Sequence, residues 1–151
     1  MREQERQPVL QMRESEFEAI RRHGEETYPL ECCGVMLGAV NGEANVVEAV
    51  VRTANARTDA AHNRYAIEPL ELVRIQREAR GQGMEIVGFY HSHPDCAAMW
   101  SSTDLAEAHW TGCSYVITAV NAGKAAETNS FRLMGSSEEL KRFEAEAVKR
   151  M

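Results

Sequence analysis

Residues 86–104 place the strongest constraint on how this chain can fold. An apolar run, Ile86–Tyr90, is followed directly by His91 and His93 and then, after a polar loop, by Asp104. A short apolar run of this kind predicts a buried strand. Side chains two positions apart on a strand face the same way. His91 and His93 are therefore expected to point at one spot as the strand ends.

These side chains form a candidate metal site. Asp104 opens the next predicted helix, so it can return to the spot that the two imidazoles face. Structural zinc sites usually have four protein ligands and are rich in cysteine, whereas catalytic sites usually have three and keep one position for water. Three ligands without an obvious fourth favour a catalytic zinc site. Imidazole and carboxylate also suit iron or manganese, so the metal stays open.

Ser101 and Asp104 also fit a different role. Together they match a helix-capping pattern, and an acid in the first turn of a helix offsets the helix dipole. Beside His91 and His93, a ligand role for Asp104 is favoured. Two roles are left open for Ser101: its hydroxyl caps the helix, or it donates to charge that develops on a substrate oxygen.

A hydrolytic metal site usually needs a base that takes the proton of the attacking water. The upstream candidate is Glu31, which lies between a predicted helix and an apolar strand, although an acid at such a place is often only solvated. His62, His109 and Cys96 are further candidates for a fourth ligand. His109 is disfavoured because it falls off the helical face of Asp104.

Length, charge and cysteine usage limit the class of protein. A chain of 151 residues predicts one domain, residues 1–151, with room for a core that needs no metal or disulfide. The net charge of −6 argues against general nucleic-acid binding. The cysteines lack CxxC spacing, which favours reduced thiols and a cytoplasmic location. Neither a signal peptide nor a membrane-spanning run is visible.

The remaining patterns predict a mixed α/β or α+β domain with one sheet and about four helices. A capping box at Ser15 predicts the first helix, and a second capping box at Ser136 predicts a final helix with Leu140, Phe143 and Ala147 on one face. Helices are expected at 15–26, 69–80 and 102–110 and after 136, and strands at 9–12, 33–40, 45–51, 65–67, 85–90, 114–119 and 128–134.

The site residues together resemble the JAMM (MPN+, Mov34/MPN/PAD-1) zinc metalloprotease family. The pattern of that family is an upstream glutamate followed by H-x-H-P-x6-S-x2-D, which this chain matches with Glu31, His91, His93, Pro94, Ser101 and Asp104. The similarity extends from about Tyr28 to Phe131 and is greatest to short prokaryotic members.

The resemblance implies a role for each of these residues. His91, His93 and Asp104 would hold one zinc ion with water in the fourth position. Glu31 would accept the proton of that water and pass it to the leaving amine, and Ser101 would hydrogen-bond the oxyanion. The implied fold is a single JAMM/MPN domain, in which helices flank a curved, mostly antiparallel mixed sheet, akin to cytidine deaminases.

The implied substrate is an amide or isopeptide bond at the C-terminus of a ubiquitin-like protein. The chain lacks an insertion long enough to recognise a distal ubiquitin, which favours a small peptidase for a sulfur-carrier protein, similar to the CysO-cysteine peptidase type. Trp100 stands where many short members have proline, so the loop from Asp95 to Trp100 is expected to differ in shape. The short strand expected at Tyr65–Ile67 is a candidate edge for an added substrate strand.

Three other functions remain as alternatives. The chain could be a non-catalytic MPN-type interaction module, a RadC-like DNA-repair-associated protein, or a nucleobase deaminase on a related scaffold. The complete set of polar positions argues against the first. Deaminases place the acid within an HxE motif and use a later CxxC, and this chain has neither.

Overall fold

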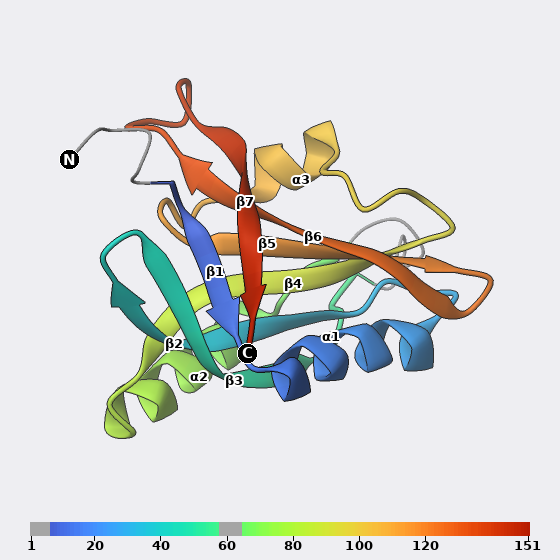
Figure 1. Cartoon of the computed structure of the whole chain (residues 1–151), viewed down its shortest axis with the longest axis horizontal. Helices are drawn as coiled ribbons and strands as arrows, with labels where there is room; N and C mark the ends of the chain where they lie inside the picture. Colours follow the sequence, from blue (N-terminus) through green and yellow to red (C-terminus); the bar gives the residue numbers. More distant parts are fainter. Residues whose placement is uncertain (1–6, 58–64) are drawn as a thin grey trace.

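The computed structural model describes residues 7–57 and 65–151, which fold into a mixed α/β structure with one sheet, as expected (Figure 1). The three helices of the described residues are α1 (Glu14–Thr27), α2 (Pro69–Gly81) and α3 (Ser102–Glu107). The strands are β1 (Val9–Met12), β2 (Cys33–Asn41), β3 (Ala44–Thr53), β4 (Glu85–Pro94), β5 (Ser114–Asn121), β6 (Lys124–Met134) and β7 (Arg142–Arg150). Within these described ranges, no helix is long and apolar enough to cross a membrane.

The sheet closes on itself in the order β1-β3-β2-β4-β5-β6-β7, because β7 pairs back with β1. Figure 1 shows the two terminal strands, blue and red, running side by side. The pairs β1–β3, β1–β7 and β4–β5 are parallel. The pairs β2–β3, β2–β4, β5–β6 and β6–β7 are antiparallel. The sheet is thus mixed, and most of its pairings are antiparallel.

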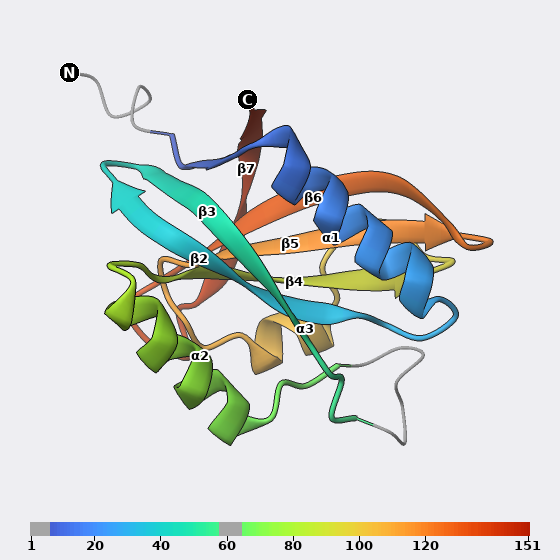
Figure 2. The ribbon, with the colours of Figure 1, turned by 90° about the horizontal axis from the view of Figure 1, so that it is seen from below.

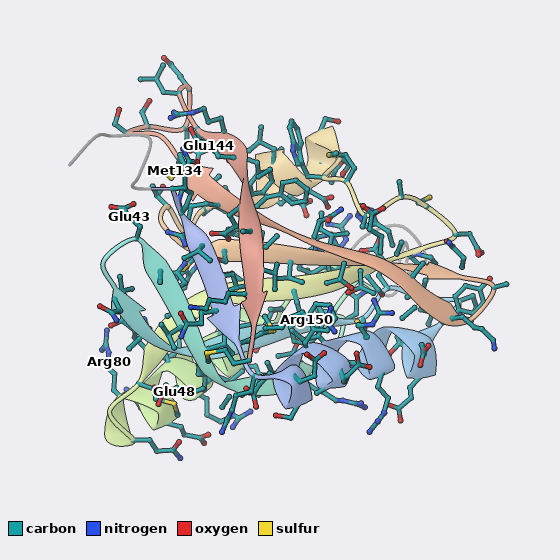
Figure 3. All side chains as sticks on the ribbon, viewed as in Figure 1. Glu43, Glu48, Arg80, Met134, Glu144 and Arg150 are labelled. Carbon is teal, nitrogen blue, oxygen red and sulfur yellow. The ribbon has the colours of Figure 1, made fainter. Side chains whose placement is uncertain are left out.

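The two longer helices cover opposite faces of this sheet (Figure 2). Successive residues of β4 point to opposite faces, and a register shift against β2 at Val87 offsets this alternation. Val87 and Tyr90 join the core that includes Phe17 and Ile20 of α1. Phe89 joins the core beneath α2. Since His91 and His93 follow Phe89 at intervals of two, they emerge on the face of the sheet that carries α2. Charged side chains such as Glu43 and Arg80 point outward from the ribbon (Figure 3).

Two buried contacts fix how α1 sits on β2 and β4. The Nδ1 atom of His23 in α1 lies 2.7 Å from the hydroxyl of Tyr90, and both side chains are buried. The Tyr90 ring lies directly over Gly34 in β2, where an added Cβ would come within 2.2 Å of the ring. Only glycine therefore leaves room for Tyr90, and the Tyr90 hydroxyl is held against α1.

The structure corrects the predicted C-terminal helix, because residues 142–150 form strand β7. Phe143 packs into the cores beside β4 and β5, and β7 pairs with β6 and β1. A buried ion pair of 2.8 Å joins Glu146 of β7 to Arg132 of β6. Local helix propensity is a weak preference that such tertiary pairing overrides.

Other boundaries also differ from those expected. Residues 65–67 are not a strand but irregular chain before α2, so the predicted sheet edge does not exist there. Helix α1 begins one residue earlier than expected, because Arg13 rather than Ser15 is its N-cap. Helix α3 ends at Glu107, and β4 continues to Pro94 because β5 pairs with it along its whole second half.

Candidate metal centre

The structure brings His91, His93 and Asp104 to one point. The two Nε2 atoms of the histidines lie 3.2 Å apart. The Asp104 carboxylate lies 3.2 Å from Nε2 of His93 through Oδ2 and 3.3 Å from Nε2 of His91 through Oδ1. Within the described ranges, this is the one group of three or more His, Cys, Asp or Glu side chains whose ligand atoms all lie within 4.8 Å of one another.

The chemical nature of these groups fits a divalent metal. Burial lowers the pKa of His91, which keeps its imidazole neutral. Burial opposes the charge of Asp104, but hydrogen bonds from both histidines hold the pKa of its carboxyl well below the usual range. The Nδ1–H group of His93 donates to the carbonyl of Ala97 at 2.9 Å, which fixes the ring so that Nε2 faces Asp104. Burial opposes the charge of His93, but its hydrogen bonds to Asp104 and Ala97 raise its pKa. Two imidazoles and one carboxylate are a donor set that suits zinc.

Glu31 lies beside this group and is only 3% exposed. It lines a pocket of about 320 Å³ together with His93 and Ser101. Burial raises the pKa of Glu31 to about 8; His93 opposes this rise, and the negative charges of Asp104 and Glu107 add to it. Its buried Oε1 atom has no hydrogen-bond partner among the described residues. A carboxyl group with a pKa near neutrality and a free oxygen is suited to accept and return a proton.

The backbone at Glu31 is held from two sides. The N–H of Cys32 donates to Oγ of Ser92 at 2.8 Å, and the N–H of Ser92 donates to the carbonyl of Cys32 at 3.3 Å. The side chain of Asn55 donates to the carbonyl of Glu31 at 3.3 Å. The antiparallel register pairs Cys33 with His91, and its continuation sets Glu31 opposite His93. The serine between the two histidines thus anchors the segment that carries Glu31.

Ser101 is the N-cap of α3, which confirms one of its two expected roles. Its Oγ accepts a hydrogen bond from the N–H of Asp104 at 3.0 Å, and its own N–H donates to Oδ2 of Asp104 at 2.9 Å. This capping box fixes the carboxylate that faces the histidines. Because Oγ acts as an acceptor in this bond, its O–H remains able to donate into the pocket that Ser101 lines.

The loop between the histidines and Ser101 forms the other wall of this pocket. Its lining here comes from Pro94, Cys96, Ala97, Met99 and Trp100. Trp100 packs on Phe143 of β7 with ring centroids 5.6 Å apart. Asp95 holds the start of the loop, since its carboxylate accepts hydrogen bonds from the Tyr28 hydroxyl and the Ala122 N–H.

Two of the other candidate ligands, His109 and Cys96, do not join the site. His109 is exposed and pairs with Glu138 at 3.0 Å. Cys96 lies at the exposed rim of the pocket, outside the ligand group. His62 falls outside the described residues.

The contact between Tyr65 and His91 was not expected from the sequence. The two rings stack with centroids 4.4 Å apart and an interplanar angle of 21°. Tyr65 was expected only as part of an edge strand. No local pattern links a residue in irregular chain to a ligand on a distant strand, so this contact had no sequence signal.

Comparisons with known proteins relate this chain to one family and to two named relatives. The family model "Prokaryotic homologs of the JAB domain" matches residues 13–134. A desampylase from Haloferax volcanii is 38% identical over 91 residues, which cover 59% of this chain and 62% of that protein. A protein of Thermus thermophilus named "Probable TtuB-protein conjugate cleaving protease" is 28% identical over 117 residues, which cover 78% of this chain and 74% of that protein. The chain thus spans less than two thirds of the length of the desampylase.

Two solved structures share the fold over nearly the whole chain. A protein from Salinibacter ruber is 34% identical, with a TM-score of 0.71, over 93% of this chain and 91% of that one. A protein from Desulfitobacterium hafniense is 24% identical, with a TM-score of 0.76, and the match covers 94% of each chain. With most of its length matched by the family model, this chain belongs to the prokaryotic JAB-domain family.

Proposed function

We propose that this protein is a zinc-dependent peptidase or isopeptidase that hydrolyses an amide bond at the C-terminus of a ubiquitin-like protein. One observation carries the proposal: the buried carboxyl group of Glu31 lies beside the converging side chains of His91, His93 and Asp104. Its pKa is raised, and no described residue hydrogen-bonds its Oε1 atom. A protein that only binds partners would not need these four side chains to lie together.

Each site residue has a role in this reaction. His91, His93 and Asp104 would hold the zinc ion, which when bound lowers the pKa of water to about 7 and polarises a carbonyl group. Glu31 accepts the proton of the attacking water on its carboxylate and then gives it to the leaving amine. The O–H of Ser101 donates to the carbonyl oxygen of the substrate as negative charge develops there.

The relatives support a protein conjugate as the substrate. One is named a desampylase, and the other is named for the cleavage of TtuB-protein conjugates. A ubiquitin-like modifier joined to a lysine side chain is therefore the first substrate to test. A sulfur-carrier protein with an amino acid or peptide joined to its C-terminal carboxyl group is the second.

The proposal is tested by incubating the zinc-loaded protein with each kind of substrate and following the products by mass spectrometry. The expected result is release of the intact ubiquitin-like protein, with one water added across the cleaved bond. Glu31→Gln is expected to lower the rate by roughly 10²–10⁴-fold while the protein still binds zinc. Asp104→Ala is expected to lose both zinc and activity.

His109→Ala is the matched control, because His109 is an exposed histidine outside the ligand group and this variant should keep full activity. Two results would contradict the proposal: no cleavage of any substrate by zinc-loaded protein, or full activity in Glu31→Gln.

A further inference from the structure

The two histidine ligands are held in different ways. The Nδ1–H of His93 donates to the carbonyl of Ala97, which fixes the orientation of that ring. The Nδ1 atom of His91 is buried and has no hydrogen-bond partner within the part of the chain that the structure describes. A histidine that binds a metal almost always donates its second N–H to a carboxylate, carbonyl or water, and this bond sets the orientation of the ring. His91 therefore needs another support.

Tyr65 is in the place to give that support. Its ring lies nearly parallel to the imidazole of His91, at an interplanar angle of 21° with centroids 4.4 Å apart. Stacked rings resist both tilting and rotation, because either movement separates the two faces or makes them clash. The side chain of His91 is only 2% exposed, so Tyr65 covers one face of a buried ring.

The segment that carries Tyr65 is itself anchored next to the site. The N–H of Ala66 donates to Oδ1 of Asn55 at 3.0 Å, and the N–H of Ala56 donates to the carbonyl of Ala66 at 2.8 Å. The same Asn55 side chain donates to the carbonyl of Glu31. The irregular segment around Tyr65 is thus tied through Asn55 to the end of β3 and to the segment that holds Glu31. These bonds give the Tyr65 ring a fixed position.

We propose that Tyr65 is a positioning residue for the metal ligand His91, whose ring it holds by stacking where no described residue supplies the usual hydrogen bond. The stack keeps Nε2 of His91 directed at His93 and Asp104. This inference rests on the proposed zinc site but not on the proposed substrate, so zinc binding tests it without any cleavage assay.

The test compares zinc affinity, measured by competition with a chromophoric chelator, in the wild-type protein and in variants. Tyr65→Leu and Tyr65→Met remove the flat ring but keep an apolar side chain, and each is expected to weaken zinc binding by roughly 10–100-fold. Tyr65→Phe keeps the stack and is expected to match the wild type. Ile67→Ala is the matched control, because it shortens an apolar side chain of the same segment that packs into the core beside α2.

The absorption spectrum of the cobalt-substituted protein gives a second readout, because its d–d bands report the coordination geometry. These bands should shift or broaden in Tyr65→Leu and stay unchanged in Tyr65→Phe and Ile67→Ala. The thermal unfolding of each metal-free variant identifies any that does not fold, and Tyr65→Met then replaces Tyr65→Leu.

Three results would overturn the inference: wild-type zinc affinity in both non-aromatic variants, equal loss in Tyr65→Phe and Tyr65→Leu, or equal loss in Ile67→Ala. Failure of the proposed function looks different. In that case the wild type and its variants show the zinc affinities expected above, but the wild-type protein cleaves no substrate.

Discussion

Ser92 provides a sharp test of how the site is built, because its side chain points away from the metal ligands on either side of it. The hydroxyl is fully buried and accepts the N–H of Cys32 at 2.8 Å. In Ser92→Ala this buried N–H loses its acceptor. An unpaired buried donor costs about 1–3 kcal/mol of unfolding free energy. For a chain of this length, that loss corresponds to a fall in Tm of about 2–12 °C.

Ser114→Ala is the matched control. Ser114 is another fully buried serine, and its Oγ accepts the side-chain N–H of Asn45 at 2.9 Å. That donor also lies 3.1 Å from the carbonyl of Gly112 and 3.3 Å from the carbonyl of Val87, so it keeps acceptors when the serine is removed. The expected loss of stability is below about 1 kcal/mol.

Ser92→Ala should also affect catalysis in a distinctive way. Because the bond to Cys32 anchors the backbone beside Glu31, its loss should lower kcat by up to roughly 100-fold while KM and zinc affinity stay near their wild-type values. Urea or thermal unfolding measures the first effect, and steady-state kinetics with chelator titration measures the second. Equal destabilisation in Ser92→Ala and Ser114→Ala, or an unchanged kcat in Ser92→Ala, would refute this reasoning.

Three further predictions concern the frame around the site. Burial, together with the positive charge of Arg52, lowers the pKa of His23 to about 4, below its unfolded value of 6.5, so the folded state binds fewer protons. The free energy of unfolding should therefore fall by up to roughly 3 kcal/mol as the pH drops from 6.5 to 4. Denaturant titration at each pH measures this fall, and His23→Gln should remove it. Arg132→Met leaves Glu146 buried without its partner and should cost about 3–5 kcal/mol in urea unfolding, whereas the double change to Met at both positions should recover much of it. Gly34→Ala places a methyl group against the buried Tyr90 ring and should cost about 1–3 kcal/mol by the same assay; an unaltered midpoint would contradict the tight packing described there.

The convergence of His91, His93 and Asp104 could be predicted because their arrangement follows from local geometry. A strand sets His91 and His93 on one face, and the capping box of Ser101 and Asp104 fixes the first turn of the following helix. Both patterns involve residues close in sequence, whose relative placement depends mainly on backbone type. The structure joins the two pieces at 3.2–3.3 Å, as their sequence order had suggested.

The predicted C-terminal helix failed for the opposite reason. Residues 142–150 contain many good helix formers, although residues 143–147 also alternate between apolar and polar side chains as a strand does. In the fold, a strand at this place closes the sheet between β6 and β1 and buries the Arg132–Glu146 pair. Strand β1 lies at the other end of the chain, so the local pattern carried no information about its pairing with β7.

By itself, the sequence determined the family, the strand and helix that carry the ligands, and which residues are chemically able to form the site. Only the tertiary structure decided that Glu31 is buried with a raised pKa, that Ser92 anchors it, and that Tyr65 stacks on His91. The physical reason is that burial and stacking depend on segments far apart in the chain. Their approach follows from the closing of the whole sheet rather than from any local preference.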